Sequence, residues 1–275
     1  MKEKPSRKER LRAAAGKRSW VVVTLYFVLR LIVLAVLISS IVQGRYESAF
    51  VCVLVLVLFL MPAIIERKLN IDLPNTLEVI ILLFIFAAEI LGELGSYYIT
   101  YPNWDTLLHT TCGFLTAAVG FSLIDILNRD SKIKFTLSPA YCAVAAFCFS
   151  MTVGVLWEFW EFAFDRLFHM DMQKDTVITA FASTYLDPTM SNVAVWVDNI
   201  QDTMVNGQSL GVPGYLDIGL YDTMEDLFVN FIGALVFSII GFFYIKRRGK
   251  GKIASQFIPV LNEMPEETPD EKTET

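Results

Sequence analysis

Long uninterrupted apolar runs limit what this chain can fold into more than any other feature. Hydrophobic residues make up 54% of its 275 residues, and the mean hydropathy is +0.49. They gather in runs of about 20 residues, the length that an α-helix needs to cross a roughly 30 Å hydrocarbon layer. A soluble domain would instead spread its apolar residues over elements that share one core. The sequence therefore predicts an all-α membrane protein.

Six such runs predict a six-helix transmembrane bundle. The first run follows a basic stretch, as in a signal peptide, but it is longer than the apolar region of a signal and other runs follow it. The fifth run is roughly 30 residues long, or about 45 Å as a helix, so it must tilt or protrude at one end. The predicted spans are 20–42, 48–65, 77–98, 106–127, 138–168 and 227–245.

Basic residues in the connections predict the orientation, because cytoplasmic loops are enriched in Lys and Arg. Residues 1–18 hold four Lys and four Arg, and more basic residues follow the second, fourth and sixth spans. The segment 165–222 holds eight Asp but only Arg166 and Lys174 as basic residues. The sequence thus predicts a multi-pass protein of the cell membrane with both termini in the cytoplasm. The expected parts are a basic cytoplasmic tail (1–19), a six-span transmembrane domain (20–246) and a disordered cytoplasmic tail (247–275).

The connection between the fifth and sixth spans, residues 168–221, is predicted to lie outside the cytoplasm. It is too rich in aromatic and branched apolar residues for a simple linker. It also carries turn signals, among them Asp187-Pro188 and Asn206-Gly207, which place tight turns between short structured pieces. These features predict an extracytoplasmic loop that caps the outer ends of the helices.

Charged residues inside the spans indicate where a site would lie. A charge in a spanning helix costs about 2.5–3.5 kcal/mol on insertion scales and usually faces the bundle interior or a water-filled cavity. Here the acidic residues of the last four spans fall mainly in the outer parts, three or four residues apart, so that those of each helix share one face; Glu78 and Asp125, near helix ends, are the exceptions in the cytoplasmic halves. If these faces meet, they form an acidic cup beneath the loop. The candidate site residues are Asp105, His109, Glu158, Glu161, Asp222 and Asp226, with Glu89 and Glu93 as weaker candidates.

The residue types in this set limit its chemistry. Carboxylates so close together cannot all stay ionised without a cation, so either a metal neutralises them or they share protons. One imidazole with several carboxylates suits Zn²⁺, Mn²⁺ or Mg²⁺, and such a metal could activate water while a carboxylate serves as base. The alternative is that these carboxylates are solvated or bonded to nearby tryptophans without chemistry. The expected metal ligands are Asp105, His109, Glu158, Asp222 and Asp226.

Three motifs, in this order, resemble those of the YjdF-like family of uncharacterised bacterial membrane proteins, and more loosely those of VanZ-like proteins. They are W-D-T-L-L-H at 104–109 with the Gly-Phe pair at 113–114, W-E-F-W-E-F at 157–162, and Y-D-T-M-E-D-L-F at 221–228. The resemblance implies the same helical membrane fold and the same site residues. It implies no reaction, because the family has no settled one. Thr106 and Thr110 stand where the family usually has a basic and an aromatic residue, which would affect the substrate.

The sequence leaves three functions open. The first is a metal-dependent hydrolase or transferase acting on a lipid-linked or cell-envelope substrate, favoured by the mixture of imidazole and carboxylates. The second is a cation- or proton-coupled transporter, which needs polar groups along a path through the membrane. The third is a non-catalytic membrane scaffold or resistance-type accessory protein. The lipid bilayer is the one partner indicated, since the basic N-terminus is better explained as a topology signal than as a nucleic-acid surface.

Overall fold

Long helices make up most of the protein, which we describe from a computed structural model over residues 19–69, 71–129, 137–247 and 254–261. The helices in these ranges are α2 (Trp20–Val42), α3 (Tyr46–Leu58), α4 (Met61–Leu69), α5 (Asn75–Ile85), the π-helix η1 (Phe86–Leu94), α6 (Tyr97–Thr100), α7 (Trp104–Arg129), α8 (Pro139–Phe168) and α9 (Leu220–Lys246), with 3-10 turns at η2 (Thr184–Leu186) and η3 (Ala254–Gln256). The strands are β1 (Ile71–Asp72), β2 (Thr176–Ile178), β3 (Phe181–Ser183), β4 (Val195–Val197), β5 (Met204–Val205), β6 (Gln208–Ser209), β7 (Tyr215–Asp217) and β8 (Val260–Leu261).

Five of the described helical segments are long and apolar enough to cross a membrane, judged by length and composition. They are Trp20–Val42, Tyr46–Lys68, Trp104–Asp125, Pro139–Phe168 and Leu220–Lys246. The predicted span 77–98 is absent from this set because its α-helix ends at Ile85 and continues directly as the π-helix η1. At the end of η1 the N–H of Gly95 donates to the carbonyl of Ile90, five residues back. Together α5 and η1 form one continuous helical stretch.

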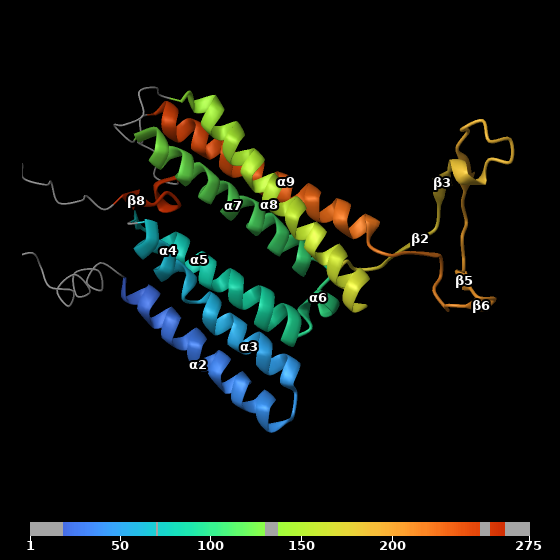
Figure 1. The fold of residues 1–275 in the computed structure, drawn as a ribbon, viewed down its shortest axis with the longest axis horizontal. Helices are drawn as coiled ribbons and strands as arrows, with labels where there is room; N and C mark the ends of the chain where they lie inside the picture. The colour runs from blue at the N-terminus through green and yellow to red at the C-terminus, as the bar shows by residue number, and fades with distance from the viewer. Residues whose placement is uncertain (1–18, 70, 130–136, 248–253, 262–275) are drawn as a thin grey trace, which may run out of the picture.

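The helices form two groups that lie side by side (Figure 1). In the first group α2, α3, α5 and η1 bury one cluster of side chains, which includes Val33, Val55 and Leu82. In the second group α7, α8 and α9 pack against one another along their lengths, whereas α5 and η1 touch α7 at only a few places. The interior of the second group holds the rings of Phe121 and Phe237, which meet edge to face at 6.0 Å.

Two glycines let the backbones of α7 and α9 touch. A Cβ atom at Gly113 of α7 would collide with the backbone of Asn230, and one at Gly233 of α9 would collide with the carbonyl of Thr110. Small residues that allow such close approach are a common basis of helix association in membranes, where apolar burial gives little driving force. Gly113 and Gly233 therefore serve close packing of α7 and α9. The contact brings the N-terminal turns of the two helices together.

The segment after α9 returns to the helices. Ala254, Phe257 and Ile258 are buried in the same cluster as Phe237 and as Leu77 of α5, and β8 pairs with β1 near the start of α5. The ring of Phe257 lies 5.0 Å from that of Phe114 in α7. This part of the predicted disordered tail 247–275 is therefore folded onto the core, because its apolar side chains fill space between the two helix groups. Residues 248–253 and 262–275 of that tail, and residues 1–18 of the basic tail, lie outside the described residues.

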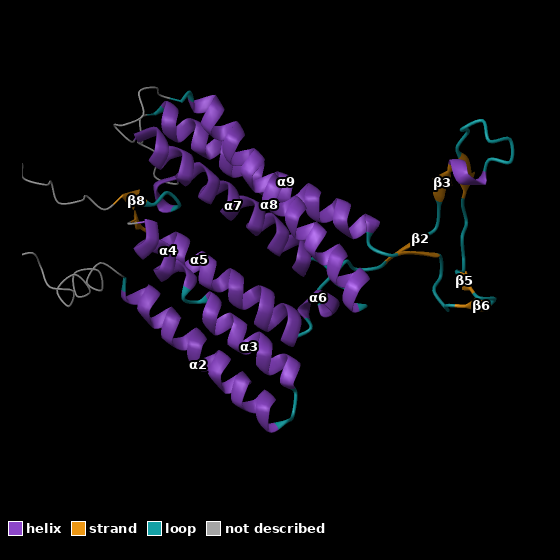
Figure 2. Cartoon of the chain, in the orientation of Figure 1, coloured by secondary structure: helices purple, strands orange, loops and turns teal. Residues whose placement is uncertain are grey.

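The connection between α8 and α9 consists of small antiparallel strand pairs, β2 with β7, β3 with β4 and β5 with β6. Its outer part extends away from the helices (Figure 2), and only its base lies against the ends of α8 and α9. The turn signal at Asn206-Gly207 is confirmed, since both residues take positive φ values, 53° and 79°, between β5 and β6. This conformation is the one that a two-residue hairpin turn requires.

Asp187 organises the tip of this connection. Its carboxylate accepts hydrogen bonds from the hydroxyl of Thr189 at 2.6 Å and from the backbone N–H groups of Thr189, Ser191 and Val193 at 2.9, 2.8 and 3.2 Å. These bonds, that of the Thr189 hydroxyl first, hold the pKa of Asp187 well below its ordinary value. The signal Asp187-Pro188 therefore marks a turn that a charged carboxylate stabilises.

Adding one methyl group at the α7–α9 contact is expected to destabilise the protein. Gly233→Ala or Gly113→Ala forces the two backbones apart, and overpacking of this kind costs about 1–3 kcal/mol. The melting temperature in detergent should fall for both variants. Ala140→Val, which adds atoms at an exposed position of α8, serves as the control and should melt with the wild type. Equal melting of all four proteins would contradict the contact.

Removing the Asp187 carboxylate is expected to loosen the tip of the connection. Because its pKa is lower in the folded than in the unfolded chain, Asp187 stabilises the turn fully above the ordinary Asp pKa of about 3.9, and this contribution is lost as the pH falls through the lowered value. At neutral pH, Asp187→Ala should speed chymotrypsin cleavage after Tyr185 and Leu186, as followed by mass spectrometry. Asp198→Ala, at an exposed residue, should leave this rate unchanged.

Candidate functional site

His109 lies among carboxylates from three helices. Its Nε2 atom is 3.5 Å from Oδ1 of Asp105, one turn earlier on α7, and 3.7 Å from Oδ2 of Asp226 on α9. Its Nδ1 atom faces Oε1 of Glu158 on α8 at 3.9 Å. One ring nitrogen thus faces a pair of carboxylates, and the other faces a third. The imidazole is the centre of the cluster.

Helix spacing and the glycine contact together place these side chains. Asp105 and His109 are four residues apart and share the face of α7 that Gly113 continues. Because Gly113 lets α9 approach α7 at Asn230, Asp226, one turn before Asn230, is carried to the same level as His109. Glu158 comes from α8, which packs against both helices.

The carboxylates are more buried than residues of their type usually are. Glu158, Glu161 and Asp226 are 3%, 7% and 3% exposed, and each has one oxygen that is fully buried without a hydrogen-bond partner among the described residues. The other oxygen of Glu161 accepts a hydrogen bond from Nε1 of Trp157 at 2.8 Å. Buried charges are normally paired or bound to a metal. These oxygens are therefore open to a proton or a cation.

Two overlapping groups have donor atoms close enough to hold a metal ion, all within 4.8 Å of one another: Asp105, His109 and Asp226, and Glu158, Glu161 and Asp226. The first group fits better. Two ligands of one tetrahedral metal lie about 3.3 Å apart when the metal–ligand bonds are near 2.0 Å. The distances of 3.5 and 3.7 Å from His109 to the two aspartates come within a few tenths of that value. Nitrogen and carboxylate oxygen suit Zn²⁺, Mn²⁺ or Mg²⁺.

Of the six sequence-predicted site residues, five lie together: Asp105, His109, Glu158, Glu161 and Asp226. Asp222 lies at the edge of the cluster and belongs to neither group of donor atoms. Its Oδ2 atom accepts a hydrogen bond from the backbone N–H of Lys174 at 2.8 Å. This bond ties the base of the loop to the first turn of α9.

Sequence reasoning missed a second tie between the loop and the site. The buried side chain of Gln173 donates to the hydroxyl of Thr223, and both side chains adjoin the carboxylate of Glu158. Next to it, Asp165 accepts hydrogen bonds from the backbone N–H groups of Met172 and Gln173 at 2.6 and 2.9 Å. No local pattern marks Gln173, because the contact joins residues 50 positions apart.

The two weaker candidates lie apart from the cluster, on the π-helix η1. Glu89 is half-buried and Glu93 is exposed. Tyr98, which packs against Gly92 of η1, is within electrostatic range of Glu93 and of Asp105.

Removing the Asp222 carboxylate is expected to release the base of the loop. A hydrogen bond to a charged group is worth about 1.5–3 kcal/mol, so trypsin should cleave after Lys174 on the order of ten times faster in Asp222→Ala. Asp202→Ala, at an exposed residue of the loop, provides the matched control and should be cleaved like the wild type. Equal rates for Asp222→Ala and wild type would show that the tie contributes nothing.

Comparison with known proteins gives one match. A family model described as "Predicted membrane protein (DUF2238)" matches residues 25–247. No curated protein and no solved structure matches the chain. The matched range contains all six candidate residues, and it is the family that the three sequence motifs resemble. The chain therefore belongs to the DUF2238 family of predicted membrane proteins.

Proposed function

We propose that this chain is a six-span protein of the cell membrane with both termini in the cytoplasm and with its His-carboxylate site at the outer surface. The span that the five long apolar helices leave out is the third in chain order, α5 with η1, which run without a break over 75–94, long enough for one crossing. The orientation is supported by the basic residues that flank the opposite end of the helices and by the acidic connection beside the site, in line with the enrichment of Lys and Arg in cytoplasmic loops.

The site is proposed to hold a divalent metal ion. The observation that supports this most strongly is the approach of Asp105 and Asp226 to Nε2 of His109, at 3.5 and 3.7 Å, with Oδ2 of Asp226 buried and without a hydrogen-bond partner among the described residues. Asp105, Asp226 and Nε2 of His109 would be the ligands. Glu158 faces Nδ1 of the same ring and would orient it, as carboxylates commonly do for metal-bound histidines. This arrangement leaves Asp222 to its contact with Lys174.

The proposed activity is hydrolysis or group transfer on a lipid-linked or cell-envelope substrate. A divalent ion in such a site lowers the pKa of a bound water toward neutrality. Glu161, held by Trp157 at 2.8 Å, and Glu158 each have one oxygen with no hydrogen-bond partner among the described residues, and this oxygen can take up a proton from the reacting group. The helices hold these groups while the loop base, through Gln173, closes one side of the site.

Packing below the site favours an enzyme over a transporter. The ring of Phe114 meets that of Phe237 edge to face at 5.0 Å, and Phe237 also meets Phe121 and Phe257. The hydroxyls of Thr116 and Ser150 bond to each other and to the carbonyl of Gly113. A transport path needs polar groups that continue from the site to the other surface. Among the described residues, the rings of Phe114, Phe121 and Phe237 fill the interior below the site, and the buried Ser122, Asp125 and Ser238 lie further along α7 and α9 than Phe114 and Asn230 do.

Elemental analysis of the purified protein tests the metal. Wild type at neutral pH should carry one equivalent of Zn²⁺, Mn²⁺ or Mg²⁺, and Asp105→Ala, His109→Ala and Asp226→Ala should each lose it. Glu158→Gln should weaken retention by about 10–100-fold, the usual effect of losing a group that orients a ligand. Retention should fall as the pH is lowered, because protons compete for the ligands.

Asp222→Ala is the matched control, because it removes a neighbouring carboxylate that is outside the ligand set. It should keep its metal. Metal-free wild type at neutral pH would contradict the proposal, as would equal loss in all variants. A proteoliposome flux that Glu158→Gln abolishes would favour the transporter, and a cellular phenotype that survives loss of Asp105, His109 and Asp226 together would favour the scaffold.

A further inference from the structure

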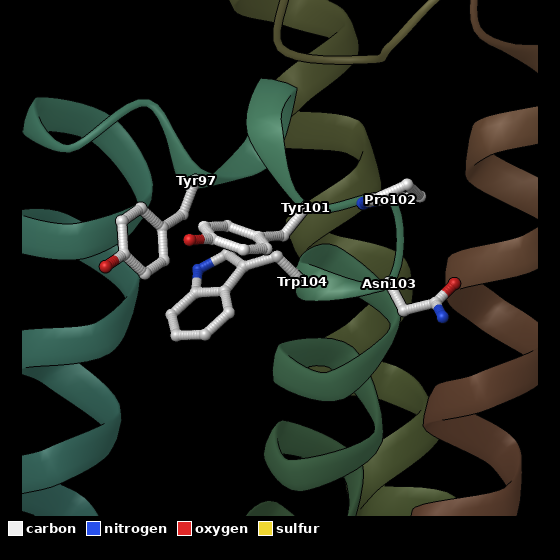
Figure 3. Close-up of a pocket in the computed structure, with 5 residues that line it drawn as sticks. All are labelled: Tyr97, Tyr101, Pro102, Asn103 and Trp104. Atoms are coloured by element: carbon white, nitrogen blue, oxygen red, sulfur yellow. The ribbon is translucent and has the colours of Figure 1, made fainter.

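A pocket of about 310 Å³ opens beside the site, between α6 and the start of α7. Its lining is mainly aromatic (Figure 3), and the rings of Tyr97, Tyr101 and Trp104, the first residue of α7, lie grouped together. The ring of Tyr97 lies 4.6 Å from that of Tyr101 and 4.9 Å from that of Trp104. Because the three rings touch, they form a continuous apolar wall with no room for a ligand between them. A ligand must lie against this wall.

The pocket and the site share the first turn of α7. Trp104 lines the pocket, and the next residue, Asp105, is part of the His109 cluster. The Nε1 donor of Trp104 is buried and has no acceptor among the described residues. A molecule lying on the aromatic wall would therefore reach the carboxylates with one end, and it could supply a polar atom close to Trp104.

The position of the pocket indicates an occupant from the membrane. It lies at the ends of spanning helices, the level at which aromatic residues meet the interface between lipid headgroups and chains. Its rim is open, since Tyr101 is 50% exposed and the neighbouring Ile99 and Leu107 are 84% and 56% exposed. At this level the apolar molecules at high concentration are the lipids themselves. A water-soluble substrate would find little to bind on this wall.

Charge selects the headgroup. Asp105 follows Trp104 of the pocket in the chain, and the hydroxyl of the next residue, Thr106, donates to the carboxylate of Glu225. Among the described residues, the charged groups close to Asp105 are acidic apart from His109 and Lys174. The carboxylates outside the proposed ligand set, such as Glu225 and Glu93, would repel a purely anionic headgroup and attract an ammonium group. A phosphate beside the ammonium would still find a partner in a metal ion held by the site.

We propose that the pocket of Tyr97, Tyr101 and Trp104 binds the glycerol and upper acyl part of a zwitterionic membrane phospholipid, and that the headgroup lies over Asp105, His109 and Asp226. This proposal rests on the proposed function and names its substrate class. It makes the aromatic wall the part of the protein that holds the lipid and the His-carboxylate cluster the part that meets the headgroup.

Native mass spectrometry of the detergent-purified full chain tests the proposal with two probes, phosphatidylethanolamine and phosphatidylglycerol with the same acyl chains. Wild type should bind one phosphatidylethanolamine, and more weakly the anionic lipid, by roughly two- to fivefold as for a partly solvated charge pair. Tyr101→Ala should weaken binding about tenfold, which corresponds to about 1.4 kcal/mol. Tyr101→Phe keeps the ring and should bind like the wild type.

Phe159→Ala is the matched control, because Phe159 is an aromatic residue of α8 that is 65% exposed and lies outside the pocket lining. It should leave binding unchanged. Tyr101→Ala that binds as tightly as wild type, or equal binding of the two lipids, would overturn the proposal. Metal content measured on the same samples separates the two proposals: lipid binding that depends on Tyr101 in a metal-free wild type supports the pocket and overturns the metal site, whereas metal retention without lipid binding does the reverse.

Discussion

The backbone contact between α7 and α9 at Gly113 and Gly233 is the interaction on which the rest of the second helix group depends. Helices in a bilayer gain little from hiding apolar surface, since lipid chains are as apolar as leucine. Close approach of two backbones replaces that driving force with dispersion contacts over many atoms. It also fixes the relative height of the two helices, and so determines that Asp226 lies level with His109.

The contact between α7 and α9 also brings carboxylates together around His109, and burying them costs free energy. Glu158 and Asp226 are almost fully buried, and each leaves an oxygen without a partner among the described residues. Groups left in this condition cost free energy unless a proton or a cation neutralises them. Arrangements of this kind persist at functional sites, where the surrounding packing holds the groups in place. Here the aromatic interior of Phe114, Phe121 and Phe237 supplies that packing.

Local patterns in the sequence account for much of this outcome. The boundaries of α2 and α8 follow directly from their apolar runs, and the spacing of Asp105 and His109 along one helix face is enough to bring them together. Local patterns do not predict contacts between segments that are far apart in the sequence. In the sequence, Asp222 shares a helix face with Asp226 and looks like another site residue. Only the folded loop shows that the backbone N–H of Lys174 donates a hydrogen bond to its carboxylate.

The π-helical turn of η1 shows the same limit. Its sequence, rich in Ala, Leu and Glu, would suit an ordinary α-helix. The wider turn instead accompanies the packing of Tyr98 against Gly92, a contact that no helical period indicates. Wider turns of this type are often found at functional sites. This one contacts Tyr98, whose side chain is within electrostatic range of Asp105 in the cluster.

The return of Phe257 and Ile258 into the core has a consequence for biosynthesis. Helices of membrane proteins enter the bilayer one after another as the chain emerges from the ribosome, so α7 and α8 can be inserted while residues 254–261 are still inside it. Until those residues are released, the space beside Phe114 and Leu77 has no protein side chains to fill it. The two helix groups can therefore reach their final packing only after translation has passed the last membrane crossing, and an interruption shortly after α9 would leave an inserted but unfinished protein.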